Sequence, residues 1–146
     1  MSVTYVWKKF CDLTLYELYE ILKVRQEVFV IEQQCFYLDL DDKDQNSMHL
    51  QGMYNKKLVS YLRVITEKDK VKIGRVITKE EMRGKGIARA MMEYSLQKIA
   101  QMFPQKTIEL AAQEHLQNFY RSFGFTPISD AYDEDGIMHV DMRKSQ

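Results

Sequence analysis

Residues 73–90 read IGRVITKEEMRGKGIARA, and this stretch decides the fold. Its apolar start predicts a β-strand, its charged middle with two glycines predicts a short loop, and its end predicts the first turns of a helix. Glycines let a ligand come close to the backbone, and the first N–H groups of a helix have no partner inside it. With the helix dipole and the side chains of Arg83, Lys85 and Arg89, this corner favours an anionic ligand.

Two segments, in this order, resemble one known family. The loop is not a P-loop, because GxxxxGK[ST] is absent, and it is not a dinucleotide fingerprint, because the third glycine of GxGxxG is missing. The spacing Arg83-x-x-Gly86-x-Ala88 after a hydrophobic strand resembles the pyrophosphate loop, Q/R-x-x-G-x-G/A, of the GNAT superfamily of N-acetyltransferases. Further along the chain, residues 119–125, FYRSFGF, resemble the F/L-Y-x-x-x-G-F segment of that superfamily.

Three more blocks narrow the resemblance to the ElaA-like branch of the superfamily. They are RQEVFVIEQ at residues 25–33, AAQ at residues 111–113 and DEDGIMH at residues 133–139. The resemblance covers residues 15–142. It implies a reaction, the transfer of an acetyl group from acetyl-CoA to an amine by direct attack in a ternary complex. It leaves the acceptor open, and a non-catalytic acyl-CoA-binding or sensor protein of the same fold is the alternative.

Length and composition restrict the class of protein. A length of 146 residues predicts one domain over residues 1–146. Its 45% hydrophobic and 29% charged residues are typical of a globular protein. A formal net charge of zero gives no broad basic field for nucleic acid. No apolar run approaches the ~20 residues that span a bilayer, and the first residues do not begin a signal peptide, so a cytoplasmic protein is expected. Cys11 and Cys35 predict free thiols and no metal site.

The hydrophobic pattern predicts alternating strands and helices. Strands are expected at residues 3–10, 48–54, 58–66, 71–78, 107–112, 126–131 and 137–143, and helices at residues 15–33, 86–103 and 116–123. Thr14 and Glu17 predict a capping box at the first helix, and its expected core face holds Leu15, Leu18, Leu22 and Phe29. The order predicts an α+β fold with a mixed, mostly antiparallel central sheet and helices on both faces. The resemblance adds that the strands at 71–78 and 107–112 splay apart at a cofactor slot.

The resemblance also implies how acetyl-CoA is held. The pantetheine arm would pair with the backbone of Val76, Ile77 and Thr78, where a backbone N–H would polarise the thioester carbonyl. The pyrophosphate would lie against Arg83, Gly84, Lys85, Gly86, Ile87, Ala88 and Arg89. Gln113 stands where many relatives carry an Asn that touches the cofactor. The strand at 71–78 would in any case be a central strand of the sheet.

Acyl transfer to an amine needs a neutral amine, a polarised carbonyl and a proton for the leaving thiolate. The resemblance implies that Tyr120 is the general acid, although a tyrosine there could equally be a core aromatic. The strand at 71–78 departs from relatives that carry a glutamate base, because it holds Lys72 and Arg75 instead. The base candidates are Glu32, His49, Glu109 and His139, and His139 comes first because it lies in the terminal block.

Carboxylates gather in two segments, and both have two interpretations. Asp39, Asp41, Asp42 and Asp44 lie in the first segment, and Asp133, Glu134 and Asp135 lie in the second. In one interpretation these carboxylates only keep two loops solvated. In the other they attract a cationic amine. Arg25 is interpreted as a structural guanidinium paired with a carboxylate or backbone carbonyls, or else as part of the active-site floor. The expected acceptor is a small amine or peptide amine, possibly cationic, and the chain is expected to be a monomer or a homodimer.

Overall fold

Strands β4 (Lys70–Thr78) and β5 (Thr107–Gln113) lie at the centre of the molecule in the computed structural model, which describes residues 2–146. Met1, the first residue of the predicted domain, lies outside the described residues. One eight-stranded sheet has the order β1-β2-β3-β4-β5-β8-β6, with β7 paired to β8. The β4–β5 pair is parallel, and the other pairs among the described residues are antiparallel. The expected mixed, mostly antiparallel sheet is confirmed.

The remaining elements follow the predicted order closely. The other strands are β1 (Thr4–Lys9), β2 (Ser47–Tyr54), β3 (Lys57–Thr66), β6 (Thr126–Pro127), β7 (Tyr132–Glu134) and β8 (Ile137–Lys144). The helices are α1 (Leu15–Arg25), α2 (Ile87–Met102) and α3 (Gln117–Arg121), with short helical turns η1 (Phe10–Asp12), η2 (Gln26–Glu32), η3 (Asp44–Asn46), η4 (Glu80–Met82) and η5 (Glu114–Leu116). Among the described residues, no helix is long and apolar enough to cross a membrane.

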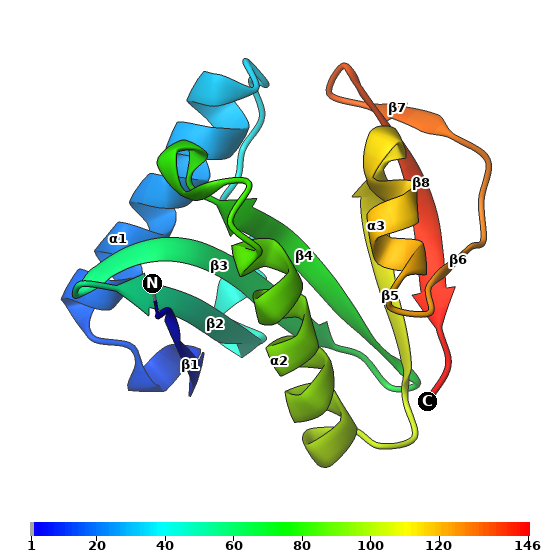
Figure 1. Cartoon of the computed structure of the whole chain (residues 1–146), viewed down its shortest axis with the longest axis horizontal. Coiled ribbons are helices and arrows are strands. Elements are labelled where there is room, and N and C mark those ends of the chain that lie inside the picture. Colours follow the sequence, from blue (N-terminus) through cyan, green and yellow to red (C-terminus); the bar gives the residue numbers. More distant parts are fainter. Residues whose placement is uncertain (1) are drawn as a thin grey trace.

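Strands β4 and β5 separate part-way along their length, so that the sheet opens as a V (Figure 1). Their pairing ends at Ile73 and Leu110, although β4 continues to Thr78 and β5 to Gln113. The register of β3 against β4 shifts at the same place, and Arg75 has a φ of 53° there. Such a bulge bends a strand and increases its twist. The expected splay is therefore confirmed, and a bulge in β4 accompanies it.

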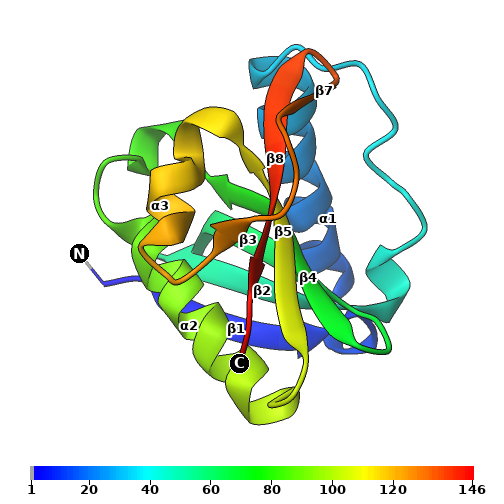
Figure 2. The same ribbon diagram turned by 90° about the vertical axis from the view of Figure 1, so that its right-hand side faces the viewer.

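Helices α1 and α2 cover opposite faces of the sheet (Figure 2). On β3, Tyr61 packs with the residues of α1, whereas its neighbour Leu62 packs with those of α2, because successive side chains of a strand point to opposite faces. On α2 the buried side chains are Ile87, Met91, Met92, Ser95 and Ile99. Each face of the sheet thus has its own apolar core.

Helix α1 begins at the predicted capping box, in which the Thr14 hydroxyl accepts from the Glu17 backbone N–H and the Glu17 carboxylate accepts from the Thr14 N–H. The predicted core face is correct only in part. Arg25 on that face is fully buried and Phe29 packs against the core under α1, but Leu15 is 85% exposed, and the buried apolar stripe is Ile21, Val24 and Val28. Residues Gln26–Glu32 form a π-helix, which changes the spacing of side chains after the end of α1. The continuous helix predicted to residue 33 is therefore an α-helix followed by a π-helical segment.

The C-terminal region differs from the prediction in one element. The expected strand at residues 126–131 is limited to Thr126–Pro127, and β7 forms a tight hairpin with β8 instead. Proline cannot donate to a strand ladder, which limits the first of these strands. The hairpin turn uses Asp135 with a φ of 53° and Gly136 with a φ of 85°. This turn brings the acidic terminal block to the open end of the V.

Candidate active site

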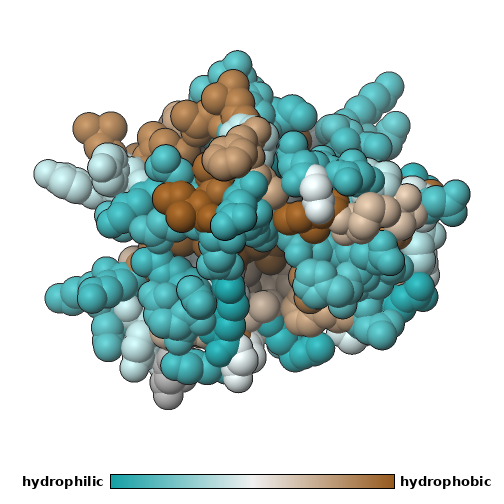
Figure 3. Space-filling model, turned by 90° about the horizontal axis from the view of Figure 1, so that it is seen from above, coloured by the Kyte–Doolittle hydropathy of each residue, from teal (hydrophilic) through white to brown (hydrophobic). Residues whose placement is uncertain are grey.

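Two cavities meet where β4 and β5 separate. The loop cavity, of ≈ 610 Å³, lies among the loop after β4, the start of α2 and the η5–α3 segment. The hairpin cavity, of ≈ 450 Å³, lies between the segment that follows η2, strand β4 and the β7–β8 hairpin. Both cavities are lined by Gln33, Val76, Gln113, Leu116 and Tyr120. Seen from above, the molecule has a hollow with an apolar floor between mostly hydrophilic side chains (Figure 3).

The glycine loop gives the loop cavity room for a ligand at a helix end. Gly84 and Gly86 have φ values of 75° and 78°, in the region that favours glycine, and Gly86 is the N-cap of α2. A Cβ added to either glycine would meet no atom within 4 Å. The space beside the two glycines is therefore open next to the first helical turn, whose N–H groups have no partner inside the helix, and an anionic group can fill it.

The loop cavity carries more positive than negative charge. Arg83 lines it, with Nη1 2.8 Å from Glu32 Oε2 and Nε donating to the Thr78 carbonyl. Arg89 also lines it, and its guanidinium lies 4.9 Å from the centre of the Phe123 ring. Lys85 is exposed and is not among the lining residues. Two arginines against one glutamate leave the cavity with a positive balance that suits phosphate groups.

The backbone edge of β4 is open beside this cavity. Beyond Ile73, no residue of β5 pairs with β4 in the described part of the chain. Val76, Ile77 and Thr78 lie in this unpaired part of β4 and line the loop cavity. The Ile77 side chain itself is buried in the core between α1 and the sheet. An extended ligand can use such an edge as an additional strand would. The structure thus brings the predicted cofactor residues together with the exception of Lys85, and their contacts with a cofactor stay a prediction.

Tyr120 lies at the junction of the two cavities. It is 6% exposed, and its ring packs edge-on against Phe119 and Phe125. Burial raises the pKa of Tyr120 to about 12, so the phenol keeps its proton at neutral pH. Its hydroxyl makes no hydrogen bond with any described side chain or backbone group. A protonated, unpaired hydroxyl at the junction can donate to a ligand that spans it.

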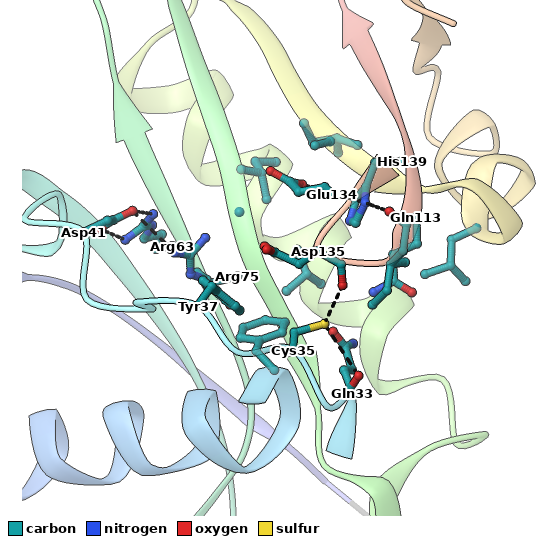
Figure 4. Close-up of a pocket in the computed structure, with 18 of the residues that line it drawn as sticks. Gln33, Cys35, Tyr37, Asp41, Arg63, Arg75, Gln113, Glu134, Asp135 and His139 are labelled. Atoms are coloured by element: carbon teal, nitrogen blue, oxygen red, sulfur yellow. Dashed lines mark hydrogen bonds and ion pairs between the residues drawn. The ribbon is translucent and has the colours of Figure 1, made fainter. Parts of the chain in front are cut away.

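His139 lies in the hairpin cavity, on β8 directly opposite Gln113 of β5 (Figure 4). Its Nδ1 is 2.8 Å from the Ile137 carbonyl oxygen and 3.7 Å from Glu134 Oε2. The ring stacks on Tyr132, with centroids 6.2 Å apart. The hairpin therefore fixes both the position and the plane of the imidazole.

The other base candidates lie elsewhere. Glu32 lines the loop cavity and is paired with Arg83. His49 is fully buried, and its nitrogens are 2.6 Å from the Tyr61 hydroxyl and 2.9 Å from the Asp44 carbonyl. Glu109 lines neither cavity and pairs with Lys70 and Arg143. Of the four candidates, His139 is the one that lines the hairpin cavity.

Three of the aspartates near residue 40 are already paired with arginines. Arg25 is fully buried, with Nε 2.8 Å from Asp39 and Nη1 2.6 Å from Asp44. Arg63 binds Asp41 and Asp44, and Arg75 binds Asp39 with Nε at 2.7 Å. Three arginines and three aspartates leave this network without net charge. Arg25 is thus the structural guanidinium of the first interpretation, and Asp39, Asp41 and Asp44 have no unpaired charge with which to attract an amine.

Several residues that line the hairpin cavity have no role in the sequence-based prediction. Gln33 lines both cavities, and Cys35, Tyr37, Arg63 and Arg75 line the hairpin cavity. The Cys35 thiol lies 3.2 Å from the Asp135 carbonyl oxygen, which links the two sides of the V (Figure 4). Gln33 ends the block at residues 25–33 that carried the resemblance, so the block contained a signal, but nothing in it indicated a side chain at the junction.

The sequence matches one known family over most of its length. Residues 16–146 match the family model for an acetyltransferase (GNAT) domain. ElaA of Escherichia coli is 41% identical over 138 residues, which cover 91% of this chain and 90% of ElaA. The chain belongs to the ElaA branch of the GNAT acetyltransferase family. Another relative in this branch, a UPF0039 protein of Synechocystis, is 40% identical over 97% of this chain and 95% of its own length.

The same GNAT fold is present in solved structures. The crystal structure of Escherichia coli ElaA has a TM-score of 0.95 and 37% identity, with 99% of this chain and 100% of that chain covered. An acyl-CoA N-acyltransferase from Pseudomonas aeruginosa has a TM-score of 0.94 and 36% identity, with the same coverage. The resemblance that was drawn from the sequence motifs is therefore confirmed.

Proposed function

We propose that this GNAT protein is an acetyl-CoA-dependent N-acetyltransferase that transfers the acetyl group directly to an amine in a ternary complex. The observation that carries the proposal is the junction at Val76, Gln113 and Tyr120, which line both cavities. Ligands that enter from the two cavities would meet there. A protein that only senses acyl-CoA needs the loop cavity alone, so the second cavity favours an enzyme.

The loop cavity fits acetyl-CoA as the first substrate. Its glycine loop faces open space at the start of α2, and Arg83 and Arg89 outweigh the charge of Glu32. The open edge of β4 past Ile73 fits an extended arm. The Pseudomonas aeruginosa relative, whose name is acyl-CoA N-acyltransferase, supports the same class of donor. We propose that the pyrophosphate binds the loop and that the thioester reaches the junction.

Tyr120 would act on the leaving sulfur. Its hydroxyl is protonated at neutral pH and has no partner within the described chain. As the C–S bond breaks, a hydrogen bond from this hydroxyl would stabilise the charge that develops on sulfur. A free thiol of the cysteine type has a pKa of about 8.5, so the thiolate needs only modest help to leave.

The hairpin cavity would take the acceptor, a small amine or a peptide amine. Glu134 and Asp135 line it, and neither carboxylate has an ion pair with a lysine or arginine among the described residues. We propose that they attract the cationic form of the amine from solvent. We also propose that the protein works in the cytoplasm, where acetyl-CoA would be used and where the free Cys11 and Cys35 thiols would stay reduced.

The test is release of free thiol from acetyl-CoA in the presence of a panel of primary amines, with calorimetric titration of acetyl-CoA alongside. The proposal predicts saturable binding of acetyl-CoA and amine-dependent thiol release. Binding without release on any amine would favour the sensor, and the absence of binding would refute the assignment of the loop cavity.

A further inference from the structure

We infer that His139 is the general base of the reaction and that its Nε2 atom takes the proton from the acceptor ammonium. The inference rests on the proposed function, and it adds the residue that makes the amine nucleophilic. Strand β4 carries no carboxylate for this step, since its charged residues are Lys70, Lys72 and Arg75. The base must therefore come from another element at the junction.

The tautomer of His139 follows from its hydrogen bond. Nδ1 lies 2.8 Å from the Ile137 carbonyl oxygen, and a carbonyl oxygen can only accept. Nδ1 therefore carries the hydrogen, and in the neutral ring Nε2 carries the lone pair. Nε2 has no hydrogen-bond partner in the described chain and is not enclosed. An imidazole held in this way presents a free proton acceptor to the cavity.

The position of His139 follows from the sheet. It pairs with Gln113 in the antiparallel β5–β8 ladder, so the two side chains lie on one face with Cβ atoms roughly 4.5–5.5 Å apart. Gln113 lines both cavities, whereas His139 lines the hairpin cavity. The imidazole therefore stands on the acceptor side, one side chain away from the junction.

Glu134 and Tyr132 support this assignment. The Glu134 carboxylate lies 3.7 Å from Nδ1, on the side of the ring opposite the lone pair, where it would stabilise the charge that the ring gains. Tyr132 stacks on the ring, and its hydroxyl donates to Asp141 at 2.6 Å. These contacts involve Nδ1 and the face of the ring, and they leave Nε2 without a partner in the described chain.

The proton balance is complete without a further reactant. One ammonium proton moves to Nε2 of His139, and the neutral amine forms the C–N bond at the acyl carbon. The C–S bond breaks, and the second proton of the amine reaches the sulfur by way of the Tyr120 hydroxyl. His139 then returns its proton to solvent. The products are the amide, free CoA and one proton.

The experiment uses His139→Gln with primary amines whose ammonium pKa values range from well below to well above the assay pH. Loss of a general base typically lowers turnover by ~10²–10⁴-fold. We expect that loss for strongly basic amines and a much smaller loss for amines that are already neutral. Added imidazole should restore part of the activity toward basic amines. Met138→Gln, on the neighbouring exposed residue of β8, is the matched control and should keep the activity of the unmodified protein.

The outcomes separate the inference from the proposed function. An equal loss across all amines, or no loss, would overturn the role of His139 while amine acetylation itself stands. An unmodified protein that binds acetyl-CoA and acetylates no amine would overturn both. If His139→Gln fails to fold by circular dichroism, His139→Asn with imidazole rescue provides the same comparison.

Discussion

Removal of the Tyr120 hydroxyl tests the proposed chemistry. Tyr120→Phe should lower turnover by ~10²-fold, the low end of the range for a lost general acid, because water can partly replace the hydroxyl. Acetyl-CoA affinity should change little, since the ring that packs against Phe119 and Phe125 is kept. Steady-state kinetics on a good acceptor measures this. Tyr94→Phe, on α2 and outside both cavities, is the control, and full turnover in Tyr120→Phe would make Tyr120 a core residue only.

A substitution at Gly86 tests the role of the glycine loop. Gly86→Val should weaken acetyl-CoA binding strongly, because its side chain would enter the open space at the start of α2. Calorimetric titration of the folded variant measures this. Gly136→Val is a matched control, since Gly136 also has a positive φ and open space but lies in the β7–β8 turn. Equal loss of affinity in both variants would show that backbone strain, rather than blocked space, is responsible.

At the scale of elements, ion pairs with arginines hold the segment between η2 and β2 in place. Arg63 beside Asp41 holds the pKa of that carboxyl well below its usual range. For Asp44, burial raises the pKa, but hydrogen bonds from Arg25 and Arg63 lower it by more. A carboxyl with a lowered folded pKa stabilises the fold above its unfolded pKa of about 3.9, and that stabilisation is lost as the pH falls through the folded value.

Stability should therefore decrease below pH ~4 because of these two aspartates. Urea unfolding at pH values from 7 to 2.5 measures the free energy of unfolding. In Asp41→Asn the decrease should be smaller, because one of the two carboxyls no longer titrates. An unchanged pH dependence in that variant would mean that the Arg63–Asp41 pair does not contribute.

The sequence predicted elements better than faces or pairings. The strand–glycine loop–helix at residues 73–90 was predictable, because its apolar run, glycines and helix start are all local signals. The core face of α1 was predictable only in part, because the position of the sheet decides how much of the helix is covered, and Leu15 in the first turn stays exposed. The β7–β8 hairpin has a local signal in Asp135-Gly136, but its register depends on contacts with β5.

In the candidate site, too, residues of local motifs were predictable and residues brought together by the fold were not. Residues of the glycine loop and Tyr120 lie in contiguous motifs, so the family resemblance placed them at the site, and all of them except Lys85 line the loop cavity. Gln33 and Cys35 reach the hairpin cavity from the segment that follows η2, and Arg75 reaches it from the bulge of β4. No local pattern shows that these elements converge. Similarly, nothing in the sequence around the four aspartates at positions 39–44 showed that three of them form ion pairs with arginines from α1, β3 and β4.

At the scale of the whole molecule, the two cavities differ in charge, and this difference predicts selectivity. The loop cavity has a positive balance, whereas the six charged side chains that line the hairpin cavity balance, and its Glu134 and Asp135 make no ion pair with a lysine or arginine of the described chain. Polyamines, amino-sugars or basic peptide termini should be better acceptors than neutral or anionic amines. Exposed charges act over about 8 Å at ~0.15 M salt, so carboxylates beyond the cavity should add little.

Replacement of both carboxylates checks this selectivity. Glu134→Gln with Asp135→Asn should raise KM for a cationic acceptor more than KM for acetyl-CoA, because only the hairpin cavity loses charge. Glu93→Gln, an exposed position on α2 outside both cavities, is the control. A screen in which anionic or neutral amines are the best acceptors would reject the prediction.

The central claim is that donor and acceptor are bound together and meet at the junction of the two cavities. Initial velocities measured while acetyl-CoA and the amine are both varied test this claim most directly. A ternary complex predicts double-reciprocal lines that intersect, because each substrate's effect depends on the other. Parallel lines would contradict the account, since they would mean that the acetyl group passes to the protein before the amine binds.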